Sequence, residues 1–201
     1  MSYGRSRPLG RELYIAVALV ACAVLALEIS LSRILSVLLR FHFVFLVISA
    51  ALCGLGIGGM LSPSSWRRLG DRFGDRWVLG LLALGAAVAT PAALALLFRT
   101  ALSQRLFEAL TVPIVSVAPF LFAGAFLSYA FHRAVRDAGA LYFADLFGAA
   151  VGALAVILLL NTLGGINAAV AASLLFAAAA LALFAPGARA GTVLSLSLIH
   201  I

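Results

Sequence analysis

The sequence predicts an all-α, polytopic membrane helix bundle with six transmembrane helices. Hydrophobic residues make up 65% of the 201 residues and charged residues only 10%, and the mean hydropathy is +1.18. Soluble domains are less apolar and more highly charged. The apolar runs recur about every 30 residues, and a helix of about 20 residues crosses a bilayer. The runs lack the apolar and polar alternation of barrel strands, which argues against a transmembrane barrel.

The first run, residues 13–27, follows a segment of residues 1–12 that holds three arginines. This pattern is typical of a signal sequence or of a first transmembrane helix. The residues before Cys22 also resemble a lipoprotein cleavage site, but hydrophobicity continues past this cysteine and five more apolar runs follow. We therefore expect an uncleaved first helix after a cytoplasmic amino-terminal segment.

Two charged residues, Glu28 and Arg33, come directly after this run. At 1.5 Å per residue, Glu28 lies about 22 Å beyond Leu13, in the far half of the membrane. The two side chains are about 140° apart on an ideal helix, so they are poor partners for each other. Each is expected to face another helix or the far interface. The alternative is that Glu28 marks a helix end beside the headgroups.

The second run, residues 41–61, is rich in glycine. Gly54, Gly56 and Gly59 have the G-x-G-x-x-G spacing of a dinucleotide site, but no strand precedes them and no amphipathic helix follows. In a membrane helix, such glycines permit close packing or bending.

The most polar stretch, residues 62–76, predicts a cytoplasmic loop. Within it, Ser65 is expected to cap a short helix that lies in the membrane interface on its apolar face, which is formed by Trp66, Leu69 and Phe73.

The third and fourth spans are predicted at residues 77–98 and 110–131, each followed by a short polar loop. Pro91 and Pro119 lie inside them. Each proline removes one backbone donor and is expected to kink its helix.

The fifth span, residues 141–161, is the most informative stretch. It holds one carboxylate, Asp145, near its start, and an ionised group in hydrocarbon needs a partner, water or headgroups. Gly148 and Gly152 lie four residues apart on one face, where a neighbouring helix can approach closely. Asn161 and the glycines after it predict the turn into a sixth span, residues 168–184.

We divide the chain into residues 1–12, a six-helix membrane domain at residues 13–185 and a carboxy-terminal tail at residues 186–201. Residues 192–201 fit neither a membrane helix nor a soluble element, and their end resembles translated sequencing adapter. We therefore expect the natural reading frame to be interrupted there.

All 14 basic residues are arginine, and they lie in the breaks between apolar runs. The net charge of +7 therefore indicates membrane topology and not nucleic-acid binding. With six spans, ten arginines lie on the side of the amino terminus and four on the other side. The positive-inside rule then predicts that both termini lie in the cytoplasm.

Residues 141–168, LYFADLFGAAVGALAVILLLNTLGGINA, together with residues 118–133, resemble the membrane domain that precedes a spermidine synthase-like domain in bacterial fusion proteins. Residues 27–59 resemble the start of the same domain, with Glu28 and Arg33 where that family tends to carry an acid and an arginine. The resemblance covers nearly all of residues 13–185.

A second resemblance is narrower. Residues 69–76, LGDRFGDR, resemble the loop motif between the second and third helices of major facilitator superfamily transporters. Asp75 departs from this motif, in which a basic residue is usual. The resemblance implies a fold like one half of such a transporter, and a loop that holds helix ends together and controls their movement. The match is formed by Gly70, Asp71, Arg72 and Gly74.

The resemblance implies an integral module of the bacterial inner membrane that anchors a cytoplasmic aminopropyltransferase-like domain, absent from this chain, with substrate delivery as a further role. The candidate residues for substrate contact or helix packing are Glu28, Arg33, Asp145 and Asn161. The alternative is a half-transporter of the facilitator type that moves a small, cationic solute as a homodimer.

The chain alone is not expected to be an enzyme. Aminopropyl transfer in that family resides in a Rossmann-like domain, and nothing like it occurs in this sequence. Nucleophilic catalysis needs a base within hydrogen-bond reach of a serine or cysteine, whereas His42 and His132 both lie at predicted membrane edges. No metal-ligand spacing is present, so we expect no cofactor.

Overall fold

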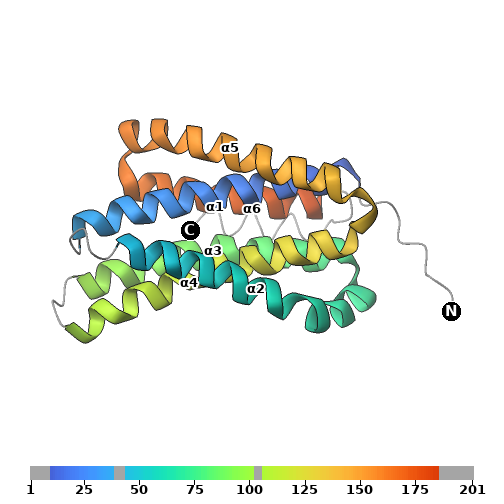
Figure 1. Ribbon diagram of the computed structural model, residues 1–201, viewed down its shortest axis with the longest axis horizontal. Helices are drawn as coiled ribbons and strands as arrows, with labels where there is room; N and C mark the ends of the chain where they lie inside the picture. Colours follow the sequence, from blue (N-terminus) through green and yellow to red (C-terminus); the bar gives the residue numbers. More distant parts are fainter. Residues whose placement is uncertain (1–9, 39–43, 102–105, 186–201) are drawn as a thin grey trace.

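The computed structural model describes residues 10–38, 44–101 and 106–185. Its α-helices are α1 (Arg11–Leu38), α2 (Val44–Phe73), α3 (Asp75–Ala101), α4 (Leu106–Arg133), α5 (Ala138–Thr162) and α6 (Gly164–Phe184), with the short 3-10 helix η2 (Val135–Asp137) before α5. Figure 1 shows the six helices lying side by side as one elongated bundle. These residues contain no strand, which confirms the all-α prediction.

Four stretches are long and apolar enough to cross a membrane. They are Arg11–Val37, Asp75–Arg99, Val135–Thr162 and Gly164–Phe184. In addition, α2 contains a shorter apolar stretch, Ile48–Leu61. These features indicate a membrane protein whose apolar helices suit contact with a lipid bilayer.

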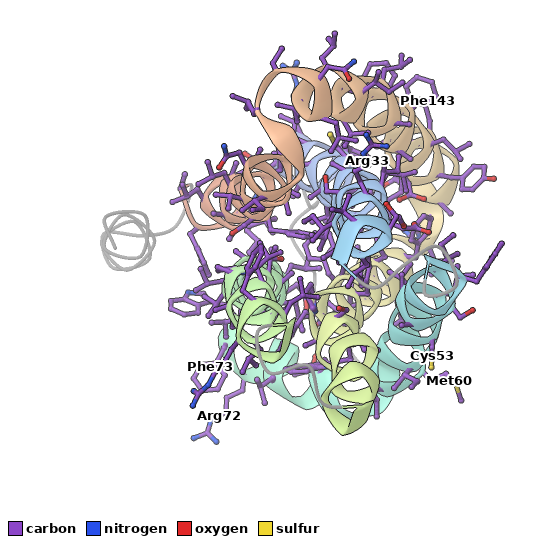
Figure 2. All side chains as sticks on the ribbon, turned by 90° about the vertical axis from the view of Figure 1, so that its left-hand side faces the viewer. Arg33, Cys53, Met60, Arg72, Phe73 and Phe143 are labelled. Carbon is purple, nitrogen blue, oxygen red and sulfur yellow. The ribbon has the colours of Figure 1, made fainter. Side chains whose placement is uncertain are left out.

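Two groups of three helices make up the bundle. In one group α1 packs along α5 and α6, and in the other α4 packs along α2 and α3. The groups are joined mainly by α3 and α6. Figure 2, which looks along the bundle, shows α1 in its interior. Most apolar side chains of α1 are correspondingly buried, and those of Ala16, Val17 and Val20 have no exposed surface.

Glycines set the closest helix contacts. Lipid is as apolar as the helix surfaces, so close van der Waals packing has to hold the helices together. A Cβ atom added at Gly148 of α5 would collide with the backbone of Ala18 of α1, and one added at Gly152 would lie 2.5 Å from the carbonyl oxygen of Cys22. The sequence prediction that a helix approaches this face is therefore confirmed, and the helix is α1.

The contact between α2 and α4 repeats this arrangement. A Cβ atom at Gly54 would lie 2.8 Å from the carbonyl oxygen of Val117, and one at Gly58 would collide with that of Leu121. Gly54 and Gly58 are therefore packing residues, as the sequence predicts, whereas Gly56 faces open space.

The two groups follow the same plan. When α1, α2 and α3 are exchanged with α4, α5 and α6, the pairing of α1 with α5 becomes that of α4 with α2. Likewise the pairing of α1 with α6 becomes that of α4 with α3, and α3 with α6 is unchanged. The glycine contacts obey the same exchange, because each pair of glycines meets two carbonyl oxygens four residues apart.

The structure corrects the expected loop at residues 62–76. The helix α2 runs unbroken to Phe73, so Ser65 lies inside it and does not cap a separate helix. The break comes at Gly74, whose φ of +93° is in the left-handed region that favours glycine. The amide of Gly74 donates to the carbonyl of Gly70 at 2.8 Å and closes the helix end. Polarity alone does not end a helix, whereas a positive φ does.

Two other boundaries differ from the sequence prediction. The helix α1 continues ten residues beyond Glu28 to Leu38, so Glu28 does not mark a helix end. The helix α6 begins at Gly164, four residues before the predicted start, because Gly164 takes a φ of +79° and makes the turn by itself.

Candidate functional site

Charged and hydroxyl side chains gather where α2 ends, α3 begins and α4 ends. We define the α2–α3 polar cluster as Asp71, Asp75, Tyr129 and Arg133. Its centre is the carboxylate of Asp75, the first residue of α3. The Nε of Arg133 and the hydroxyl of Tyr129 each donate to Oδ1 of Asp75 at 2.7 Å. A terminal nitrogen of Arg133 also contacts this oxygen.

Asp71 takes a lesser part in the cluster. Its Oδ1 accepts a hydrogen bond from a terminal nitrogen of Arg133 at 3.4 Å, and its side chain is 64% exposed. The side chain of Asp75 is only 13% exposed. Ion pairs that water reaches contribute little to stability, so Asp75 is the stronger partner of Arg133.

The charge of Asp75 also affects Arg133. Burial alone would lower the pKa of the guanidinium, but the hydrogen bond and the charge of Asp75 outweigh it, so the pKa of Arg133 is raised. Arg133 is therefore a permanent cation that ties the end of α4 to the start of α3.

The motif glycines shape the cluster. A Cβ atom at Gly70 would collide with the hydroxyl of Tyr129 and would lie 2.9 Å from Oδ1 of Asp75. Glycine at this position therefore makes room for the hydrogen bond between Tyr129 and Asp75. Gly74 supplies the turn that brings Asp75 back towards α4.

Arg72, the remaining motif residue, lies outside the cluster. Figure 2 shows Arg72 and Phe73 pointing away from the bundle. The guanidinium carbon of Arg72 lies 5.5 Å from the centre of the Phe73 ring, within the range of a cation–π contact. An arginine on an exposed aromatic ring at a helix end suits the headgroup region of a membrane.

A further ion pair fixes α1 at the same end of the bundle. A terminal nitrogen of Arg76 lies 3.4 Å from Oε2 of Glu12, and both side chains are more than a third exposed. Together with the α2–α3 polar cluster, this pair links the ends of α1, α2, α3 and α4.

The structure separates two of the predicted site residues, Glu28 and Asp145. Because Gly148 faces Ala18 across the seam between α1 and α5, Asp145 lies level with Ile15. Glu28 is 13 residues further along α1, about 20 Å away along the bundle. Both side chains are partly buried, and no hydrogen bond or ion pair joins them to another residue in the described ranges. They form two separate positions and not one clamp.

The other two predicted residues, Arg33 and Asn161, lie together. Both line a cavity of about 540 Å³ at the end of the bundle opposite the α2–α3 polar cluster. In Figure 2, Arg33 lies at the end of the bundle that faces the viewer. Helical spacing could not place Arg33 beside Asn161, because this proximity depends on α1 packing against α5 and α6.

Sequence reasoning missed Asp75, Tyr129 and Arg133 as a group. In the sequence, Asp75 stands out only as a departure from the loop motif, and Arg133 contributes only to the count of arginines on each side of the membrane. The available signal was topological, since the start of α3 and the end of α4 must meet if the two helices form an antiparallel pair.

In the described ranges, no group of three or more histidine, cysteine, aspartate or glutamate residues could hold a metal ion. Comparison with known proteins gives no match to a family model, to a curated protein or to a solved structure. The described residues show close helix packing at glycines, ion pairs that join helix ends, and a cavity that Arg33 lines.

Proposed function

We propose that the chain is the membrane module of a spermidine synthase-like fusion protein, with six spans and both termini in the cytoplasm of a bacterium. It anchors a cytoplasmic aminopropyltransferase-like domain at the inner membrane and delivers substrate to that domain. The proposal is based on the resemblance over residues 13–185.

The repeated helix pairing supports the facilitator-like part of this proposal. Facilitator halves are built from two inverted repeats of three helices. In this bundle, exchange of α1–α3 with α4–α6 preserves the helix pairing and the glycine contacts. An arrangement of this kind requires α2 and α4 to span the membrane together with the other four helices.

The two partly buried acids support a cationic substrate. Asp145 lies about 10 Å from the start of α5, and Glu28 lies about 25 Å from the start of α1, so the two carboxylates lie at different depths. A carboxylate without a protein partner inside a membrane domain is a candidate contact for a cation. In this proposal Asp145 is the contact nearer the cytoplasm.

The gene tests the module proposal first. An in-frame Rossmann-like domain downstream of the codon for residue 191 supports it, and its absence from that gene contradicts it. In the intact fusion, Asp145→Asn is expected to lower polyamine-dependent aminopropyl transfer. Asp137→Asn is the matched control, because Asp137 is an exposed acid outside the seam between α1 and α5. Equal activity of the two variants at equal expression would argue against a substrate role for Asp145.

The alternative is a half-transporter that moves a small cationic solute as a homodimer. The same repeated helix pairing favours it, because facilitator halves operate in pairs around a shared path. The test is counterflow of labelled spermidine in proteoliposomes, together with cross-linking of the protein in the membrane. Counterflow by a cross-linkable dimer supports this alternative, and a strict monomer without counterflow contradicts it.

A further inference from the structure

The cavity that holds Arg33 and Asn161 combines one positive charge with apolar walls. Among the described residues that line it, Arg33 alone is charged, and Asn161 adds an amide. The apolar part includes Ile34, Phe98, Ile157 and Leu160. A cation would meet repulsion from the guanidinium here, whereas an anion with an apolar tail would find partners for both of its parts.

Arg33 is available for such a ligand. Its side chain is exposed, and no ion pair or side-chain hydrogen bond joins it to another residue in the described ranges. The guanidinium presents several N–H donors in a planar fork that matches the oxygens of a phosphate group. Within the described part of the chain, the lining therefore leaves a strong anion-binding group without a partner.

The height of the cavity in the bundle indicates where the ligand comes from. Arg33 lies 21 residues beyond Glu12 on α1, about 32 Å along the helix. Glu12 is paired with Arg76 at the end that contains the α2–α3 polar cluster. The hydrocarbon core of a bilayer is about 30 Å thick, so Arg33 lies level with the phosphates of one leaflet when the cluster lies at the other surface.

We propose that this cavity binds a phosphate-bearing amphiphile, with Arg33 and Asn161 on the phosphate oxygens and the apolar walls around the first carbons of the chain. The first backbone amides of α6, which begins at Gly164 with no side-chain cap, face the same end and add donors. The site differs from the acidic positions of the proposed function, and it stands whether or not the chain is a synthase module.

Binding is tested on the full chain in detergent by native mass spectrometry with dioctanoyl phosphatidylglycerol. The wild type is expected to retain this lipid, and Arg33→Gln is expected to weaken binding by about tenfold or more, because a charge-assisted hydrogen bond is lost. Arg99→Gln is the matched control, since Arg99 is an exposed arginine at the same end that does not line the cavity. It is expected to bind as the wild type does.

Two further ligands separate the possible sources of the phosphate. Dioctanoylglycerol has the chains without the phosphate and is expected to bind weakly. Displacement of phosphatidylglycerol by millimolar inorganic phosphate would support a site for the phosphate group itself. Failure of inorganic phosphate to compete would support a site for a lipid headgroup with its chain.

A second variant keeps the charge of Arg33 and fills part of the cavity. Ile157→Trp replaces an exposed aliphatic side chain of the cavity wall with a bulky indole ring. It is expected to reduce phosphatidylglycerol binding while Arg33 is intact. The proposal is overturned if Arg33→Gln binds phosphatidylglycerol as tightly as the wild type does. It is also overturned if Arg99→Gln weakens binding as much as Arg33→Gln does. Equal binding of dioctanoylglycerol and phosphatidylglycerol, or normal binding by Ile157→Trp, overturns it as well.

Discussion

Arg133, the last residue of α4, and Asp75, the first residue of α3, join two helix ends through a 2.7 Å hydrogen bond between charged groups. The two residues are 58 positions apart in the sequence, and their contact closes the open end of the antiparallel pair formed by α3 and α4. The helix α2 meets the same contact through Gly70 and Asp71.

Asp75→Asn is expected to lower the free energy of unfolding by about 1.5–3 kcal/mol, because it removes the charge that Arg133 is paired with in a largely buried site. Asp71→Asn is the control in the same motif and is expected to cost less than about 0.5 kcal/mol, since Asp71 is mostly exposed. Reversible denaturant unfolding in detergent measures both values. Equal losses would show that Asp75 is not the principal partner of Arg133.

Gly70→Ala is expected to destabilise the protein because its methyl group would collide with the hydroxyl of Tyr129. Tyr129→Phe alone is expected to cost about 1.5–3 kcal/mol, the value of a hydrogen bond to a charged group. In the double variant the new methyl group no longer meets the hydroxyl of Tyr129. The combined loss of stability is therefore expected to be smaller than the sum of the two single losses. A double-mutant cycle from unfolding curves measures this coupling. Strict additivity would place the hydroxyl away from Gly70.

Gly58→Ala tests the seam between α2 and α4. The new methyl group would meet the backbone of Leu121, which cannot move aside as a flexible side chain can, and a loss of about 1–3 kcal/mol is expected. Gly56→Ala, two residues away on the same helix, points into open space and is expected to be neutral or to gain up to about 1 kcal/mol from helix propensity. Thermal unfolding in detergent compares them. A loss at Gly56 as large as that at Gly58 would contradict the described packing.

The proposed topology predicts the labelling of introduced cysteines in intact cells. With Cys22 and Cys53 replaced by serine, Leu163→Cys at the turn between α5 and α6 is expected to react with a membrane-impermeant maleimide. Arg72→Cys at the opposite end is expected to react only after the cells are opened. Both positions are exposed in the bundle, so access depends on the side of the membrane. Labelling of Arg72→Cys from outside would reverse the orientation.

The sequence was sufficient for those parts of the fold that depend on local spacing. Long apolar runs predicted the helices, and the four-residue spacing of Gly148 and Gly152 predicted a face for close packing. Such spacing shows that a helix approaches, but it cannot identify which one, so α1 was not foreseen as the partner of α5. Polarity placed a loop at residues 62–76, whereas backbone geometry placed the break at Gly74 alone.

The candidate sites were harder to predict because they are non-local. The sequence points to Arg33 through the resemblance at residues 27–59 and to Asn161 as the start of a turn, and only the packing of α1 against α5 and α6 brings them to one cavity. Arg133 was counted for its charge and not for its position. Its role depends on the register between α3 and α4, which no single stretch of sequence determines.

The partnership of α1 with α5 has a consequence for synthesis of the protein. Ala18 meets Gly148, so the first helix enters the membrane long before the helix that covers it has been translated. Gly54 of α2 must likewise wait for Val117 of α4. In the proposed six-span topology, the seam between α2 and α4 cannot close before α4 is inserted, and the seam between α1 and α5 cannot close before α5 is inserted. The face of α1 that α5 covers in the folded protein therefore stays open during insertion of the first four helices.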